Sequence, residues 1–561
     1  MSLAQWRKRV LPLGVILAIL ACGTGTTVTT VTTETGGSVT TAEGVATTSG
    51  ESSEAVVFRS AWHEPTQPLD PRQVTSGSSE IAASLFEGLA VADAEGNVTP
   101  HGAESWDVSP DGLVYTFNLN QDVRWSDGTP VTAGDYEFSI KSGLDPATAS
   151  PTSGNLYAIK NAEAFNSGEI SDPDEVGVRV VDDYTLEITL EAPNPVFLLT
   201  VATAAPMWPT PVHVVEQFEE YEWTEAENIV TNGPYTLSEW VHDDSMTLVP
   251  NPEYWGPRPE VDEVQIRLLA DPTSQGLPAF EAGELDYALV PPGDLERIQN
   301  DPLGELLQFT QVQRFYGVYM DTGHPPFDDV RVRQAFYLAI DREAIANGVL
   351  HGLTTPAWWN VPHGVPGHSP DIRLEGTAED AQALLAEAGF PNGEGFPEQT
   401  MIVRTNEVEE LQAQAIQAQW RDVLGVEIQM QFLEPQAFRE FQNGMRSGND
   451  YDLIHLSATA DAPDPSIYHN LVIGTDGEGY FPTRFTADDY GELLEAGASE
   501  QDPEARLDIY HQLEELLIEK YTVIIPVSNE NLAYLLREGW SGLEFPFGLR
   551  GPVYDDLTFS G

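Results

Sequence analysis

The stretch Ala103–Lys141, AESWDVSPDGLVYTFNLNQDVRWSDGTPVTAGDYEFSIK, decides how the chain folds, and the rest of the sequence can be placed from it. Polar and apolar residues alternate over Val114–Leu119, so this segment predicts a strand with one apolar face. The residues just before it, Ser109–Gly112, have the composition of a turn. The stretch therefore begins with a turn that leads into a half-buried strand.

The second half of the stretch predicts a short strand, another turn and a helix. The short strand lies around Val123–Trp125, and the turn Ser126–Pro130 closes it. Thr132 stands where a helix N-cap is expected, ahead of Asp135–Ile140, which has the pattern of first helical turns. The order is thus strand, turn, strand, turn and capped helix.

This order, with the residues AESW, SPDG, YTF, DGTP and the helix start at their spacing, resembles the entry signature of family 5 extracellular solute-binding proteins. These are the binding proteins of peptide-type ABC importers. The resemblance runs from Ala55 to the end of the chain. Further segments match the family pattern in order: Pro68–Pro71, Asn232–Leu237, Asn251–Gly256 and Pro325–Asp341.

The resemblance implies an α/β fold like that of periplasmic binding proteins, with two lobes joined by a hinge. It divides the folded body into three domains. Domain I combines residues 55–102, 224–311 and 524–561, domain II is 103–223, and domain III is 312–523.

A second α/β lobe is also expected from local patterns. Thr377–Gly389 predicts a capped helix closed by glycine, and a longer helix ends at Gly425 before the strand Val426–Phe432. A terminal strand is predicted at Thr522–Val527.

The most unusual feature of the composition is its large negative net charge. The chain has 561 residues, with 89 acidic and 26 basic side chains and a net charge of -63, so a basic surface for nucleic acid is excluded. Hydrophobic residues make up 41%, which is typical of folded proteins. A saline environment would account for the acid excess, and a preference for cationic ligands is the alternative.

The N-terminus has the pattern of a signal peptide. A basic segment at Trp6–Arg9 precedes the apolar run Val10–Leu20, which is too short to span a membrane. Cys22 is the single cysteine, so no intrachain disulfide is possible, and the residues before it resemble a lipobox. We expect cleavage after residues 1–21, a lipid on Cys22 and a Thr/Ser/Gly-rich tether over 23–54. The alternative is an ordinary signal peptide with an incidental cysteine.

The candidate ligand site is the segment Tyr451–Pro465. It resembles the family motif in which the first carboxylate of ADYPDP can pair with the α-amine of a bound peptide, and the matching position is Asp461. A carboxylate and an ammonium in a closed cleft form a charge-assisted hydrogen bond. The alternative is that Asp461 only caps the loop stiffened by Pro463 and Pro465.

Two departures from the family pattern concern the ligand. Ala458 replaces the usual tryptophan, and His455 stands where oligopeptide binders can carry an arginine for the ligand carboxylate. Arg404 could supply that cation, or could be a surface arginine that balances nearby glutamates. Aromatic residues in segments that flank the family's cleft could line it, although for each one taken alone a place in the core is the favoured alternative: Tyr157, Tyr319, Trp358 and Trp359. Trp358 and Trp359 are adjacent and cannot both be core residues of a strand, so we expect one of them to face the cleft or solvent.

These features predict a monomeric, lipid-anchored receptor outside the cytoplasm that captures a peptide or similar amine-bearing solute for an ABC permease. Motifs of hydrolases, metal sites and cofactor sites were not recognised, so no enzyme activity, metal or cofactor is expected. The alternatives are a binding protein for another solute, such as a sugar or a metal chelate, and a sensor or chaperone of the same fold.

Overall fold

The computed structural model describes residues 55–65, 67–75, 78–93, 96–446, 450–459, 462–472, 483–546 and 551–561. The predicted signal peptide with Cys22, the predicted tether and Asp461 lie outside these residues. The described chain mixes helices and strands, as expected for an α/β protein. No helix in this part of the chain combines the length and the apolar character that crossing a bilayer requires.

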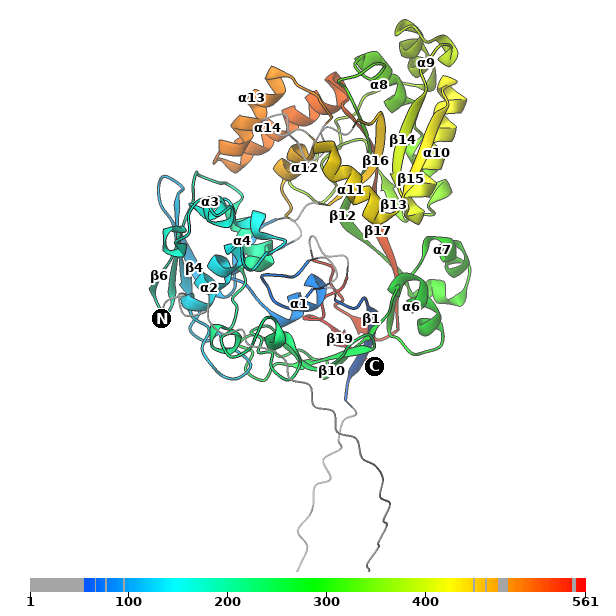
Figure 1. Cartoon of the computed structure of the whole chain (residues 1–561). Coiled ribbons are helices and arrows are strands. Elements are labelled where there is room, and N and C mark those ends of the chain that lie inside the picture. Colours follow the sequence, from blue (N-terminus) through cyan, green and yellow to red (C-terminus); the bar gives the residue numbers. More distant parts are fainter. Residues whose placement is uncertain are drawn as a thin grey trace, which may run out of the picture. The chain divides into compact units, whose positions relative to one another are not determined.

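The opening stretch forms an antiparallel sheet with the strand order β4-β5-β7-β6 (Figure 1). Its strands are β4 Ala103–Val108, β5 Val114–Leu119, β6 Val178–Asp182 and β7 Thr185–Thr189. The predicted strand Val114–Leu119 is confirmed, and its alternate side chains are buried. The predicted strand around Val123–Trp125 is wrong. Only the bridge between Arg124 and Pro130 forms there, because the chain turns again at once.

The helix predicted after this sheet is α2, Ala133–Leu144, and Thr132 is its N-cap. The Asp135 carboxylate accepts hydrogen bonds from the backbone N–H of Thr132 at 2.8 Å and from its hydroxyl at 3.1 Å. These bonds satisfy groups that the first helical turn leaves unpaired. The remaining helices have these bounds: α1 Ser79–Leu85, α3 Ala162–Asn166, α4 Phe197–Thr203, α5 Val212–Val215, α6 Pro272–Glu281, α7 Pro292–Gln299, α8 Val330–Leu338, α9 Ala378–Glu387, α10 Glu407–Leu424, α11 Pro435–Arg446, α12 Pro465–Val472, α13 Asp488–Ser499 and α14 Pro503–Glu515.

Another sheet has the order β1-β10-β9-β8. It comprises β1 Val57–Trp62, β8 Tyr235–Val241, β9 Ser245–Pro250 and β10 Glu263–Leu268. β1 pairs in parallel with β10, whereas the other neighbours are antiparallel. The first strand of the body therefore lies beside a segment about two hundred residues later in the sequence. Short pairs join β2 Ala90–Ala92 to β3 Val98–Pro100, and β18 Trp540–Ser541 to β19 Thr558–Phe559.

The largest sheet runs in the order β11-β17-β12-β16-β14-β15, with β13 paired to β17. Its strands are β11 Tyr287–Leu289, β12 Leu307–Met320, β13 Thr354–Pro356, β14 Gln399–Arg404, β15 Ile428–Leu433, β16 Leu453–Thr459 and β17 Ile524–Leu536. β12 and β17 are long and antiparallel, and their pairing shifts register between Gln311 and Phe315. The terminal strand was predicted to end at Val527, but β17 continues to Leu536. Nearly every residue of β17 is buried, so both faces of the strand are covered along its length.

Most buried apolar side chains of the described residues fall into two clusters, called here core A and core B. Core A packs against the largest sheet and includes Trp420 of α10 and Tyr510 of α14. Core B packs against the sheets of β1 and β5 and includes Tyr136 of α2. β17 contributes to both, since Ala533 and Leu535 lie in core A while Tyr534 and Leu536 lie in core B.

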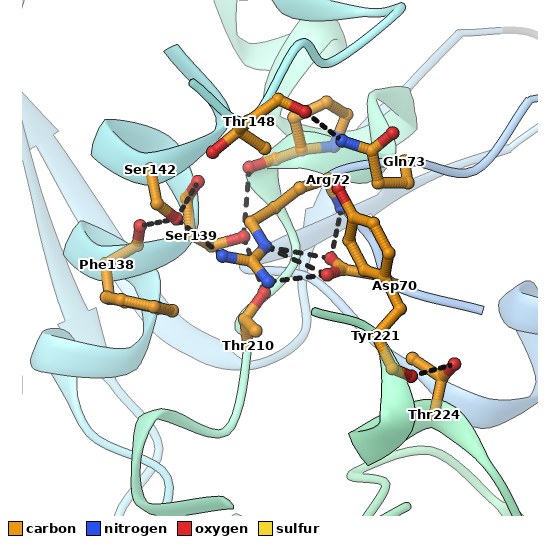
Figure 2. Close-up of polar contacts among 11 residues, drawn as sticks. Asp70, Arg72, Gln73, Phe138, Ser139, Ser142, Thr148, Thr210, Tyr221 and Thr224 are labelled. Carbon is orange, nitrogen blue, oxygen red and sulfur yellow. Dashed lines mark hydrogen bonds and ion pairs between the residues drawn. The ribbon is translucent and has the colours of Figure 1, made fainter. Parts of the chain in front are cut away.

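A buried polar junction ties the segment after β1 to α2 (Figure 2). The guanidinium of Arg72 donates to the Asp70 carboxylate through Nε at 2.9 Å and through a terminal nitrogen at 2.5 Å. Its other terminal nitrogen donates to the Ser142 hydroxyl at 3.0 Å. The Gln73 amide donates to the carbonyl of Thr148 at 2.8 Å. The segment Asp70–Gln73 is therefore held against α2 and the loop after it by an ion pair and hydrogen bonds.

We predict that Arg72→Met destabilises the protein by about 3–5 kcal/mol, because it leaves a fully buried Asp70 carboxylate unpaired. The matched control is Arg179→Met, which removes an ion pair whose arginine side chain is 62% exposed and should cost less than about 1 kcal/mol. Denaturant unfolding of both variants measures the difference. Equal shifts of the unfolding midpoint would contradict a structural role for the junction.

Candidate functional site

A cavity of about 890 Å³ lies where β17 passes between core A and core B. Segments far apart in the sequence form its walls: the end of β1, the start of α6, the start of α10 and the middle of β17. The lining residues are Trp62, His63, Glu64, Glu80, Asp243, Leu268, Leu269, Ala270, Asp271, Thr273, Leu289, Val290, Pro292, Leu353, Asn406, Glu407, Val408, Glu530, Asn531, Leu532 and Ala533. A cavity of this size accommodates a small organic ligand or a short peptide.

Apolar and polar side chains share the walls of the cavity about equally. Trp62 and Leu268 come from core B, while Leu353, Val290 and Ala533 come from core A. A ligand that filled the cavity would therefore contact both cores at once. Such a contact stabilises whichever arrangement of the cores buries the ligand best.

Carboxylates dominate the polar part of the lining: Glu64, Glu80, Asp243, Asp271, Glu407 and Glu530. Among the described residues that line the cavity there is no lysine or arginine. Some of these carboxylates also serve the fold. Asp271 caps α6 by accepting the backbone N–H of Thr273 at 3.1 Å, and Glu64 accepts the N–H of Asp243 at 3.1 Å. The lining as a whole favours an amine or another cationic group.

Glu530 stands at an irregular point of the β12–β17 ladder. Its Oε2 lies 3.4 Å from Nε of Arg314, which also donates to the Thr459 hydroxyl at 3.0 Å. Arg314 belongs to the part of β12 where the register with β17 shifts. The cavity thus adjoins a place where the two long strands depart from regular pairing.

Of the described residues predicted for the site, none lines this cavity. Tyr157 packs against core B, and its hydroxyl donates to Asn166 at 2.6 Å. Tyr319 is 1% exposed and lies within core A. Asp461 lies outside the described residues, so the structure does not place it.

His455 and Arg404 lie close together on neighbouring strands, since Val403 of β14 pairs with His455 of β16. His455 is fully buried, and its Nε2 lies 3.0 Å from the amide oxygen of Gln412. Burial, helped by the nearby charge of Arg404, lowers the pKa of His455 to about 3. The ring is therefore neutral at physiological pH. Arg404 forms an ion pair with the buried Glu409 and donates to Ser457 at 3.2 Å.

Trp358 and Trp359 follow β13 on an irregular loop, with ring centroids 5.8 Å apart. Trp358 packs against core A, and its carbonyl accepts the hydroxyl of Tyr337 at 2.9 Å. Trp359 meets the ring of His368 edge to face at 4.6 Å. Both side chains are partly exposed, which agrees with the alternative that they are not both core residues.

A family model described as bacterial extracellular solute-binding proteins, family 5 Middle, matches residues 97–479. The chain belongs to this family. The resemblance found in the sequence is thus confirmed, as is the predicted fold class.

Relatives of this family 5 protein carry names for different ligands. The probable deoxycholate-binding periplasmic protein YgiS of Escherichia coli is 32% identical over 86% of this chain and 89% of its own length. The dipeptide-binding protein DppE of Bacillus subtilis is 30% identical over 91% and 92%. The solved structure of the periplasmic murein tripeptide-binding protein MppA, in an unliganded open form, has a TM-score of 0.77, 27% identity, and coverage of 90% of this chain and 98% of that one.

Sequence reasoning missed the cavity of this family 5 protein because its walls come from separate segments. Trp62–Glu64 follows a predicted first strand, and Asn406–Val408 begins a predicted helix. Polar residues at the ends of a strand or helix were the available signal. That signal does not tell which ends meet in space.

We predict that His455→Leu destabilises the protein by about 1–3 kcal/mol, because it leaves the buried Gln412 amide oxygen without its partner. The matched control is His363→Leu, at an exposed position with ordinary backbone geometry, which should change stability by less than about 0.5 kcal/mol. Urea unfolding measures both. A stable His455→Leu protein that lost only ligand affinity would show that His455 contacts the ligand instead.

Proposed function

We propose that this protein is the extracellular receptor of an ABC importer and that it captures a peptide or a similar amine-bearing solute. Family membership supports the role of receptor, and the names of DppE and MppA support a peptide as ligand. The observation that carries the proposal is the cavity with apolar side chains and carboxylates, without lysine or arginine among its described lining residues. An ammonium group in such a cavity gains charge-assisted hydrogen bonds.

A second candidate ligand is an anionic amphiphile, since YgiS is named as a probable deoxycholate-binding protein. The apolar side chains of the lining suit such a ligand, but its carboxylates oppose a negative charge. The electrostatics of the cavity therefore favour the amine-bearing solute.

The mechanism proposed is closure of two lobes about the long strands. The domain limits 55–102, 103–223, 224–311, 312–523 and 524–561 are part of this proposal. Ligand binding would stabilise the closed arrangement, which the permease recognises, and the ligand leaves unaltered. A lipid on Cys22 and the tether over 23–54 would hold the monomeric receptor at the membrane.

We predict that Ala270→Trp blocks ligand capture without unfolding the protein, because Ala270 lines the cavity and is exposed. The matched control is Ala147→Trp, an exposed alanine that is not among the lining residues. Ligands that co-purify with wild type and both variants are compared by mass spectrometry, followed by calorimetry with trialanine, N-acetyl-trialanine and deoxycholate. The wild type and the Ala147→Trp variant should each bind trialanine at least tenfold more tightly than they bind N-acetyl-trialanine.

Binding of deoxycholate in place of trialanine would overturn the proposed ligand class and leave the receptor role standing. Equal capture by the Ala270 and Ala147 variants would show that the ligand binds elsewhere.

Asp461 remains the predicted partner of the ligand ammonium. We predict that Asp461→Asn weakens binding of amine-bearing ligands by about 2–3 kcal/mol, because the buried ammonium would lose its charged partner. Calorimetry against the same peptides measures this loss, and Asp464→Asn is unsuitable as a control because Asp464 forms a buried ion pair. An unchanged affinity would remove Asp461 from the site.

A further inference from the structure

A cluster of buried titratable side chains lies outside the cavity, where α12, α13 and α14 meet the loop after β13. Glu514 of α14 and His469 of α12 are both fully buried. One oxygen of Glu514 accepts the backbone N–H of Asn360. The other, Oε2, lies 3.4 Å from Nε2 of His469.

The remaining ring nitrogen of His469 has its own partner. Nδ1 lies 2.7 Å from the hydroxyl oxygen of Tyr490 on α13. By contrast, Nε2 of His469 and Oε2 of Glu514 have no hydrogen bond among the described residues. Each therefore faces the other as its nearest available partner in a site closed to solvent.

The wider surroundings contribute little that could neutralise this pair. Tyr490, Tyr510 and Tyr337 are the tyrosines whose charges would interact with the cluster, and burial raises the pKa of each, so they stay protonated. The charge of Asp464 also acts on His469, and Asp464 is held in a bidentate pair with Arg506 at 2.6 and 2.8 Å. They satisfy one another and leave Glu514 and His469 as the groups able to change charge.

Burial shifts the pKa values of Glu514 and His469 in opposite directions. It raises the pKa of Glu514 to about 7, although the backbone N–H groups of Asn360 and Val361 favour the carboxylate. It lowers the pKa of His469 to about 3. A charged imidazolium is therefore disfavoured, and Glu514 is the group of the pair that changes charge near neutral pH.

We propose that Glu514 and His469 form a proton-linked pair that positions the loop at Asn360 against α12, and that loss of one proton moves the N–H of the His469 ring from Nδ1 to Nε2. In the protonated state, Oε2–H of Glu514 donates to Nε2, and Nδ1–H donates to Tyr490. In the deprotonated state, the Oε2 proton has passed to Nε2 and the Nδ1 proton has left for solvent. Nε2–H then donates to the carboxylate, and the Tyr490 hydroxyl donates to Nδ1.

The functional consequence of this pair rests on the proposed function. The loop at Asn360 directly follows Trp358 and Trp359, and α12 directly follows the predicted ligand segment that ends at Pro465. Glu514 thus contacts residues that adjoin both segments that the sequence assigns to the ligand site. It is a positioning residue, because it holds those segments without lining the cavity.

The test is a titration of the ligand-free, full-length protein with ¹⁵N-labelled histidine, between about pH 5 and pH 9. His469, assigned with a His469→Gln variant, should stay neutral while its protonated nitrogen changes from Nδ1 to Nε2 with a midpoint near pH 7. Glu514→Gln should hold the Nδ1–H tautomer throughout, since its amide N–H can donate to Nε2. Glu515→Gln, an exposed neighbour on the same helix, should titrate as wild type.

Hydrogen exchange of the Asn360 amide tests positioning separately. Its protection, corrected for the intrinsic rate, should rise through the same midpoint in wild type and stay constant in Glu514→Gln, because a carboxylate accepts more strongly than a neutral carboxyl. A constant tautomer in wild type, or a tautomer change that survives in Glu514→Gln, would overturn the pair. A tautomer change without altered protection of Asn360 would overturn its positioning role. If Glu514→Gln does not fold, the wild-type titration alone still tests the proton-linked pair. Neither measurement needs a ligand, so either can fail while the proposed function stands.

Discussion

The ladder between β12 and β17 is the constraint on which the rest of the structure depends. Alternate side chains of β17 enter core A and core B, so this strand cannot shift along its partner without disturbing both. The ladder shifts register twice, between Gln311 and Phe315 and between Tyr316 and Gly317, and the cavity adjoins the first of these points through Glu530. Regular pairing therefore fixes the two cores, and the cavity lies beside a point where that pairing is interrupted.

Four arginines among the described residues of this acidic chain are buried, and they donate to carboxylate or carbonyl oxygens. Arg72 and Arg506 pair with buried carboxylates, while Arg333 and Arg342 donate to the carbonyls of Tyr521 and Pro526. These guanidinium groups stabilise the interior, where an unpaired carboxylate or carbonyl would be costly. The described lining of the cavity, by contrast, contains several carboxylates and no arginine or lysine, which gives the cavity its acidic character.

The sequence predicted the features that depend on near neighbours. Thr132 and Thr377 begin helices as expected, and Gly425 ends α10 with a φ of 69°, because capping involves residues a few positions apart. The cavity could not be predicted, since Trp62, Asn406 and Glu530 meet only through the packing of distant elements. The burial of His455 was likewise hidden, because alternation along a strand does not show which face a further layer covers.

The position of β17 in the chain also governs when the protein can be completed. This strand lies between β12 and β11 in the largest sheet, yet the last part of the sequence supplies it. Neither core can complete its packing before β17 has been synthesised, because both cores include side chains of this strand. The nascent chain thus emerges from the ribosome without its last long strand, so neither core can finish packing until synthesis is nearly complete.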